Sequence, residues 1–193
     1  YDEHIYFFSG LSIAELAKNH NMSIVKMAHQ DAHGGSMRYY IKKSTSNIIT
    51  DGNHDFLDEE KAMNLHKPEG LMSFKSNVDR ICADLKDVLK EIKSQDGQIV
   101  GYGATAKSTT LLNYASISKK DIEYICDNTP GKIGKYTPGT HIPIKSHDHF
   151  IDDNPPYTLL LAWNHKNEIF EKEKQYRDNG GKFITYFPKV IVE

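Results

Sequence analysis

The chain has 193 residues, of which 38% are hydrophobic and 26% charged, and its formal net charge is −2. This balance argues against a dedicated nucleic-acid-binding or membrane-surface protein, because both need a basic electrostatic field. These residues contain no apolar run of about 18 residues and no visible secretory signal, so we expect a cytoplasmic protein without a membrane span. Cys82 and Cys126 lie in apolar runs without metal-ligand spacing and are interpreted as reduced core thiols.

The first part of the chain predicts a short helix and two strands. Residues 12–20 are typical of a helix with Ser12 as N-cap and Glu15 as its capping-box partner. Residues 23–43 are extended on both sides of a Gly-Gly pair, which indicates a strand, a turn and a returning strand. Residues 44–58 are polar and rich in turn formers, so we expect an exposed connector. Because the sequence starts at Tyr1 inside an aromatic run, we expect a piece of a longer polypeptide.

A long amphipathic helix is expected next, and with the connector it makes up residues 44–96. Its apolar side chains recur at spacings of four and three residues and form one stripe: Phe74, Val78, Ile81, Leu85, Val88, Leu89 and Ile92. Such a stripe packs against another element of the protein. Asp96 and Gly97 are expected to end the helix.

From residue 98 onward, strands and helices alternate. We expect helices at 106–115 and 167–181, and strands at 98–104, 122–127, 141–144, 157–163 and 182–188. Apolar strands separated by helices indicate a parallel sheet that is covered on both faces. Together with the right-handed crossover rule, the pattern predicts an α/β fold: a Rossmann-like, doubly wound, mostly parallel sheet over residues 97–193.

A turn that contains glycines follows the first of these strands. Gly101, Gly103 and Ala106 match the spacing G-x-G-x-x-A of dinucleotide-binding turns. Gly101 is expected to make the tight turn, and Gly103, with Ala104 beside it, to let backbone amides approach an anion. The next helix offers free amides and the positive end of its dipole, and Lys107 adds a cation. The alternative is a Rossmann-like domain whose turn binds nothing.

Three further residues are predicted to contact a ligand. Asp127 closes the second strand, 24 positions after Gly103 (127 − 103), where such folds place an acid for a ribose hydroxyl. Lys132 lies in a glycine-rich loop and either meets a diphosphate or is simply solvated. Asn164 ends the fourth strand, at the edge where open α/β sheets bind ligands. Its neighbour Trp163 either faces a base or fills the core, and we favour the core.

The first four residues hold a tyrosine, a carboxylate and an imidazole. His4 is a candidate general base, and Glu3 is placed to orient it. In a regular strand Tyr1 and Glu3 share one face while His4 points to the other, so a solvated terminus is the alternative. His147 and His149 are assigned to a polar loop. No histidine has cysteine or carboxylate partners at ligand spacing, and no metal site is expected.

Taken in order, several blocks of the sequence resemble the C-terminal half of the S-adenosylmethionine-dependent sugar C-methyltransferases. The resemblance covers nearly the whole chain and rests on YDEHIYFFS, HGGSMRYY, GYGATAKSTTLLNY, DNTPGKIGKYTPGTHIPI, LLLAWNHKNEI and GGKFITYFP. These transferases methylate a ring carbon of nucleotide-linked keto-sugars in deoxysugar biosynthesis. In that family a zinc-binding domain and a class I methyltransferase domain precede a Rossmann-like domain that holds the substrate nucleotide. Residues 1–43 would then end the methyltransferase domain, with its last helix and antiparallel strand pair.

The resemblance also implies a role for each candidate residue. His4 would remove the proton next to the sugar ketone, Glu3 would orient His4, and Tyr1 would hold the sugar or the enolate. The nucleotide, expected to be thymidine diphosphate, would be bound by Gly101, Gly103, Ala104, Lys107, Asp127, Lys132 and Asn164.

The sequence departs from the family in two ways. It has no cysteine cluster for zinc and no acidic glycine motif for the methyl donor. Zinc and S-adenosylmethionine are therefore expected to bind mainly in domains missing from this chain, and the fragment is expected to be inactive alone. The alternatives are an NAD(P)-binding oxidoreductase domain and a non-catalytic nucleotide-binding module.

Overall fold

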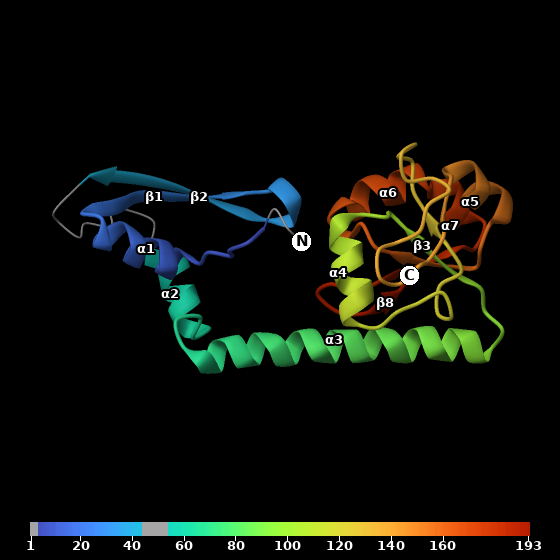
Figure 1. Ribbon diagram of the computed structural model, residues 1–193, viewed down its shortest axis with the longest axis horizontal. Helices are drawn as coiled ribbons and strands as arrows, with labels where there is room; N and C mark the ends of the chain where they lie inside the picture. The colour runs from blue at the N-terminus through green and yellow to red at the C-terminus, as the bar shows by residue number, and fades with distance from the viewer. Residues whose placement is uncertain (1–3, 44–53) are drawn as a thin grey trace. The chain divides into compact units, whose positions relative to one another are not determined.

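The computed structural model describes residues 4–43 and 54–193. The chain divides into two compact units, and the division falls between residues 77 and 78, inside the helix α3 (Pro68–Ser94). Figure 1 shows the elements of both units in chain order. Within the described ranges, no helix is both long and apolar enough to cross a membrane.

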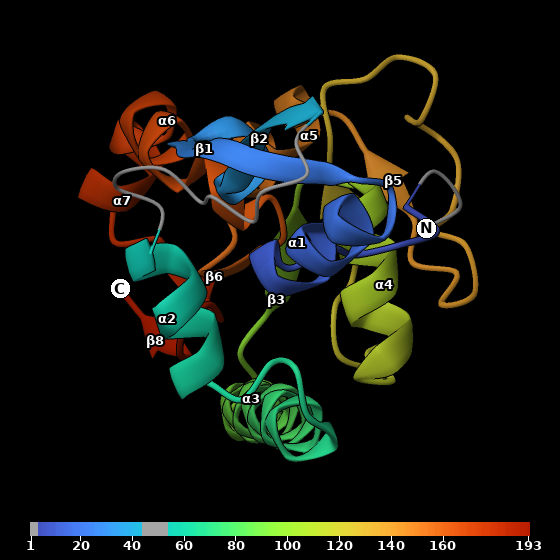
Figure 2. The ribbon, with the colours of Figure 1, turned by 90° about the vertical axis from the view of Figure 1, so that its left-hand side faces the viewer.

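The first unit contains an antiparallel strand pair with helices beside it. Its elements are α1 (Gly10–Asn19), β1 (Met22–Gln30), the short 3₁₀ turn η1 (Ala32–Gly34), β2 (Ser36–Lys43), α2 (His54–Ala62) and the start of α3. β1 and β2 pair antiparallel, which confirms the predicted strand, turn and returning strand. α1 lies against β1, as Figures 1 and 2 both show, and also contacts α2.

The start of α1 differs from its prediction. Ser9 is the N-cap: its side chain accepts a hydrogen bond from the Ser12 amide at 3.1 Å, and the Ser12 side chain accepts one from the Ser9 amide at 2.9 Å. The predicted cap of Ser12 with Glu15 is therefore wrong. The first two amides of α1 donate to the Glu60 carboxylate of α2 at 2.7 and 2.8 Å. This partner lies about fifty residues away, so no local pattern identifies it.

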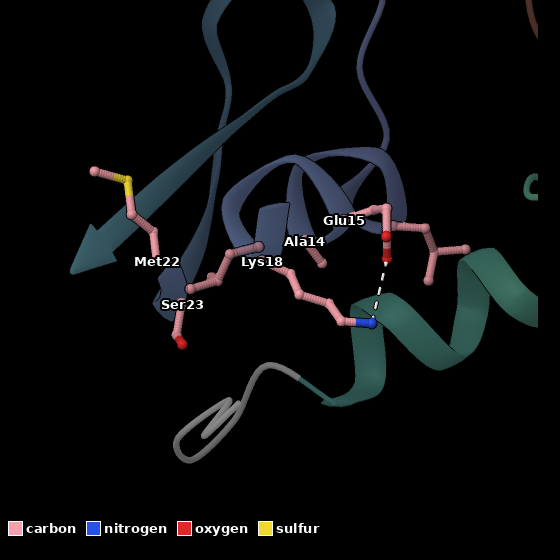
Figure 3. A pocket seen from close by; sticks show the side chains of 7 residues that line it. Ala14, Glu15, Lys18, Met22 and Ser23 are labelled. Atoms are coloured by element: carbon pink, nitrogen blue, oxygen red, sulfur yellow. Dashed lines mark ion pairs between the residues drawn. The ribbon is translucent and has the colours of Figure 1, made fainter. Parts of the chain in front are cut away.

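The predicted connector is partly helical. Residues 54–58 belong to α2, and the rest of the connector, residues 44–53, lies outside the described residues. Leu57 is only 3% exposed and packs with Ile24 and Met27 in a small core between α2 and β1. Phe56 also packs against this core, so the polar segment 54–58 carries two apolar contacts that the connector prediction did not include. Beside this core, an open pocket of about 300 Å³ is lined by α1 and the start of β1 (Figure 3), and Ile24 belongs to both.

The second unit is a doubly wound α/β domain, as predicted. After α3 it contains β3 (Ile99–Tyr102), α4 (Ala106–Tyr114), β4 (Ile125–Cys126), β5 (Ile144–Lys145), α5 (His147–Asp153), β6 (Tyr157–Leu160), η2 (Trp163–His165), α6 (Lys166–Lys172), α7 (Lys174–Asp178), β7 (Lys182–Thr185) and β8 (Ile191–Val192). The sheet order is β5-β4-β3-β6-β7-β8, and all neighbours are parallel except β7 and β8. Counted from β3, this is the order 3-2-1-4-5-6 of dinucleotide-binding folds, which reverses direction between β3 and β6.

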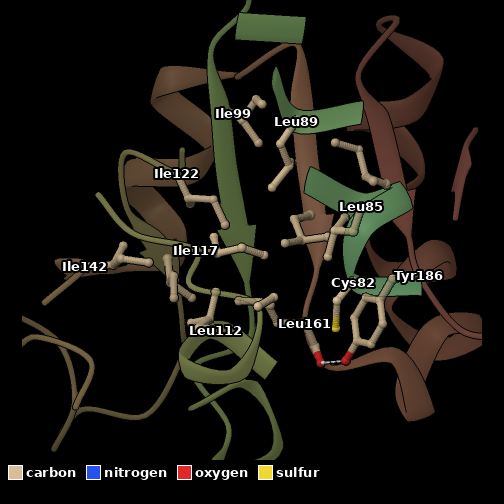
Figure 4. Packing of buried hydrophobic residues seen from close by; sticks show 14 of the residues in the cluster. Cys82, Leu85, Leu89, Ile99, Leu112, Ile117, Ile122, Ile142, Leu161 and Tyr186 are labelled. Atoms are coloured by element: carbon tan, nitrogen blue, oxygen red, sulfur yellow. Dashed lines mark hydrogen bonds between the residues drawn. The ribbon is translucent and has the colours of Figure 1, made fainter. Parts of the chain in front are cut away.

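The two faces of the sheet carry separate cores. Ile99 and Gly101 of β3 face α3 and α4, while Val100 and Tyr102 face α5, α6 and α7, as the two-residue period of a strand requires. On the first face, Leu85 and Leu89 of α3 are at most 1% exposed and pack against the sheet (Figure 4). Each fully buried leucine contributes about 2 kcal/mol to stability. The predicted stripe of α3 is thus a packing face for this unit.

Not every member of that stripe is buried. Phe74 lies in the first unit and is 66% exposed, whereas Val78 and the later members pack in the second unit, against the core on the α3 side of the sheet. The helix ends where predicted: Asp96 takes a positive φ of 56°, and the Gly97 amide returns to the Ile92 carbonyl at 3.0 Å. A Cβ on Gly97 would lie 2.5 Å from the Ile92 side chain, so glycine is required there.

Three local features of the second unit were not predicted. The prediction that His147 and His149 lie in a loop is wrong, because both residues lie in α5, whose N-cap is Ser146. The helix expected over 167–181 is divided at Glu173 into α6 and α7. The edge strand β8 pairs antiparallel with β7.

Candidate functional site

The turn after β3 is made by Gly103. Its φ is +94°, and a Cβ at this position would lie 2.7 Å from the Cβ of Ala162 after β6. Gly101 lies inside β3, and its amide donates to the Tyr124 carbonyl at 2.8 Å. The turn-making role predicted for Gly101 is therefore wrong. Glycine is needed there because a Cβ would lie 2.9 Å from the Ile125 side chain, so its role is to let neighbouring strands pack.

The backbone amides of the turn already have partners within the chain. The Gly103 amide donates to the Cys126 carbonyl at 2.8 Å, and the Ala104 amide donates to Asp127 Oδ2 at 2.8 Å. Amides without an intrahelical carbonyl partner lie one turn further on, at the start of α4. There Thr105 is the N-cap and accepts the Ser108 amide at 3.1 Å. An anion at this turn would therefore meet the first positions of α4.

Asp127 holds the turn from the end of β4. It is 9% exposed, and its Oδ1 accepts the Thr129 amide at 2.8 Å while its Oδ2 accepts the Ala104 amide and Lys132 Nζ at 3.3 Å. Lys132 Nζ also donates to the Ala104 carbonyl at 2.8 Å. Burial raises the pKa of Asp127, but these hydrogen bonds and the Lys132 charge outweigh it and lower the pKa, so the carboxyl stays ionised. The acid and the lysine thus fasten the turn to the loop after β4.

Lys107 and Asn164 lie on either side of the point where the strand order reverses. Lys107 is in the first turn of α4, and its Nζ lies 5.4 Å from the ring centroid of Trp163. Trp163 and Asn164 follow β6 in η2, and both are half-buried. Trp163 packs partly on the core and partly on Phe187, with ring centroids 4.8 Å apart. The structure therefore gathers Gly103, Ala104, Lys107, Asp127, Lys132, and Asn164 at the carboxyl edge of the sheet.

The residues of the predicted acid–base group are described only in part. Tyr1 and Glu3 lie outside the described residues. His4 belongs to the first unit, is exposed, and stacks on Phe7 with ring centroids 6.1 Å apart.

A second group of polar side chains was not predicted. Glu173, which is 2% exposed, accepts hydrogen bonds from the Tyr102 hydroxyl at 2.6 Å and from His147 Nε2 at 2.7 Å. Lys172 Nζ lies 3.3 Å from the same carboxylate and donates to the Tyr102 hydroxyl at 3.0 Å. The four come from β3, α5 and the junction of α6 and α7. The only local indication of this group in the sequence was Ser146, a residue type that favours a helix start just before His147.

The described ranges hold neither a candidate metal site nor a disulfide. Among these residues, no group of three or more histidine, cysteine, aspartate or glutamate side chains is placed to hold a metal ion. Cys82 and Cys126 are free and buried, and burial raises the pKa of both thiols, in Cys126 to about 12. Both therefore remain protonated and unreactive at neutral pH.

Two comparisons with known proteins both find C-methyltransferases. A family model described as the C-methyltransferase C-terminal domain matches residues 31–188. The chain is also similar to C-methyltransferase NovU of Streptomyces niveus, with 30% identity over 190 residues. That match covers 98% of this chain and 45% of the relative, so the chain spans about half of the relative's length.

Proposed function

The chain belongs to the C-methyltransferase C-terminal domain family, and we propose that it is the C-terminal part of a sugar C-methyltransferase. The second unit binds a nucleotide-diphosphate keto-sugar, with thymidine diphosphate as the carrier. Residues 1–43 end the methyltransferase catalytic domain and supply the general base His4. S-adenosylmethionine supplies the methyl group.

The observation that carries this proposal is the group of residues at the reversal of strand order. Ligands of open α/β sheets bind outside the carboxyl ends of the strands at this point. The first turn of α4 presents amides and a positive dipole end, and Lys107 adds a charge near Trp163, the residue before Asn164. A diphosphate matches this set of donors. Anchoring the substrate by its diphosphate provides binding energy that orients the sugar ketone for reaction.

The reaction chemistry then requires a base. Methylation of carbon needs an electron pair on that carbon, which forms when the proton next to the ketone is removed. His4 would take this proton, and the freed pair would form the bond to the methyl group while the bond from that methyl group to the donor's sulfur breaks and its electron pair stays on the sulfur. Glu3 orients His4, and Tyr1 holds the sugar or its enolate.

The turn engages the carboxylate that an adenosine-containing cofactor would need. Such a cofactor, whether S-adenosylmethionine or NAD(P), needs a free acceptor at the end of the second strand for its ribose hydroxyls. Asp127 already accepts three hydrogen bonds from the chain itself, two at Oδ2 and one at Oδ1, which leaves it little accepting capacity for a ribose. We therefore infer that the methyl donor is bound outside this chain and that the chain alone does not transfer methyl groups. The same observation weighs against an NAD(P)-dependent oxidoreductase.

Calorimetric titration with thymidine diphosphate, NADH and S-adenosylmethionine tests the proposal. We expect this chain to bind only the first. Replacing Lys107 by methionine should weaken that binding about tenfold, because a charge-assisted hydrogen bond contributes about 1.5 kcal/mol. The matched control is Lys119→Met, an exposed lysine that precedes β4 at the amino edge of the sheet, which should leave affinity unchanged. Binding of NADH alone would favour the oxidoreductase, and binding of none would favour a module with another ligand.

The base is tested in a full-length enzyme that contains these residues. His4→Asn should lower kcat by about 100-fold, the range of general-base catalysis, with substrate affinity nearly unchanged. The control His20→Asn changes an exposed histidine at the end of α1 and should retain the wild-type rate. A wild-type rate for His4→Asn would show that another group removes the proton.

A further inference from the structure

Glu173 is a buried, ionised group beside one of the apolar cores of the second unit. It is 2% exposed and borders the cluster of Val100, Cys126, Phe150 and Phe183. Burying a carboxylate is costly unless donors compensate it. Burial raises the pKa of Glu173, but hydrogen bonds from Tyr102 and His147 and nearby positive charge outweigh this and lower it. Burial also raises the pKa of Tyr102, so its hydroxyl keeps the proton that it donates.

This pairing fixes the hydrogen-bonding character of His147. Its Nε2 lies 2.7 Å from the ionised Glu173 oxygen, so Nε2 must carry the hydrogen. In the neutral imidazole the other ring nitrogen, Nδ1, is then an acceptor. Glu173 thus holds the ring in one tautomer and one orientation.

The acceptor nitrogen of His147 is open to solvent. Over the described part of the chain, His147 Nδ1 has no hydrogen-bond partner, while every buried side-chain nitrogen or oxygen atom has one. Nδ1 must therefore belong to the 23% of the His147 side chain that is exposed.

His147 stands at the same edge of the sheet as the turn of Gly103. It follows β5 directly, and parallel strands all end at one edge. Its ring centroid lies 6.3 Å from that of Tyr102, the residue before Gly103. To meet His147, a ligand whose diphosphate lies at the start of α4 would have to extend its uncharged part along this edge.

We propose that His147 contacts the ligand, accepting through Nδ1 a hydrogen bond from a hydroxyl group of the nucleotide-sugar, and that Glu173 is its positioning residue. The inference rests on the proposed function. A hydroxyl fits because it can donate to Nδ1, whereas phosphate oxygens at neutral pH are acceptors and cannot. The hydroxyl belongs either to the nucleoside or to the hexose, and the two are separable by choice of ligand.

The test uses His147→Gln. A glutamine amide nitrogen can replace Nε2 as donor to Glu173, but the side chain places no acceptor at the position of Nδ1. The matched control is His149→Gln, on the same helix, whose ring contacts Lys145 Nζ at 2.8 Å and packs on Tyr124. Affinities for inorganic pyrophosphate, thymidine diphosphate and thymidine diphosphate-glucose are measured for wild type and both variants.

We expect His147→Gln to bind thymidine diphosphate-glucose about fivefold more weakly and pyrophosphate within about twofold of wild type. Equal weakening with thymidine diphosphate would assign the hydroxyl to the nucleoside, and no weakening with it would assign the hydroxyl to the hexose. Wild-type affinity for all ligands, an equal loss that includes pyrophosphate, or the same loss in His149→Gln would overturn the inference. Failure of wild type to bind any of them would instead refute the proposed function.

Discussion

Replacing Gly103 by alanine should destabilise the second unit by about 4 kcal/mol and abolish its binding of a diphosphate. Two costs combine. An L-residue at a φ of +94° costs about 1–2 kcal/mol, and forced overpacking costs about 1–3 kcal/mol. Here the added Cβ would lie 2.7 Å from Ala162 Cβ and 3.3 Å from the Ala162 amide nitrogen, and the backbone has little freedom to move.

Two other glycines separate these costs. Gly134→Ala adds a side chain at a φ of +80° with nothing within 4 Å, so it should show the conformational cost alone. Gly101→Ala has no positive φ but meets Ile125 and Leu161 side chains at 2.9 and 3.0 Å, so it should show the packing cost alone. Urea unfolding followed by the fluorescence of Trp163, the single tryptophan of the sequence, reports on this unit. A loss for Gly103→Ala no larger than for Gly134→Ala would contradict the predicted clash.

Replacing Glu173 by alanine should cost about 4 kcal/mol, the range for removing one partner of a buried charged group. The change leaves the Tyr102 hydroxyl, His147 Nε2 and Lys172 Nζ without their shared acceptor. Glu171→Ala is the matched control, since Glu171 lies two residues earlier on α6 and is exposed. It should change stability by at most about 0.5 kcal/mol. If Glu173→Ala lost as little stability as is expected for Glu171→Ala, the buried carboxylate would contribute no net stability.

The pH dependence of unfolding gives a second test of Glu173. Its folded-state pKa lies below its value of about 4.3 in an unfolded chain. The stabilisation is therefore present above about pH 4.3 and is lost as the pH falls through the folded pKa, because the unfolded state binds the proton first. Glu173→Ala should flatten this acid limb without removing it, since the pKa of Asp127 is lowered as well. An unchanged limb would contradict the assignment.

The fold could be predicted largely from periodicity, because its determinants are local. Strand and helix patterns from residue 98 onward lead to a parallel sheet without further information. The division of the last helix could not be found in this way, since Glu173 turns inward to Tyr102 and His147, which are distant in sequence. The Ser9 cap was missed for a different reason: Ser12, with a glutamate at the expected spacing, fits the same local pattern.

For the candidate site, the spacing predicted where residues lie, while their binding roles stay predictions. Gly103, Lys107 and Asn164 do lie together where the strand order reverses. Asp127 stands at the predicted place, but its oxygens hold the Ala104 amide and Lys132. A motif specifies the position of a carboxylate and not its partner, which depends on how the loop after β4 folds back. Apart from Ser146, which favours a helix start before His147, no local sequence pattern indicated the pair of Glu173 and His147.

The hydrogen bonds at the turn bear on the entropy of binding. Gly103 and Ala104 are fastened to Cys126 and Asp127 before any ligand arrives. Association usually costs free energy for ordering flexible loops, and a segment already fixed by its own chain largely avoids that cost. The turn is thus preorganised, and the affinity of the proposed ligand would depend mainly on the donors and charges that it meets there, with little loss of backbone freedom.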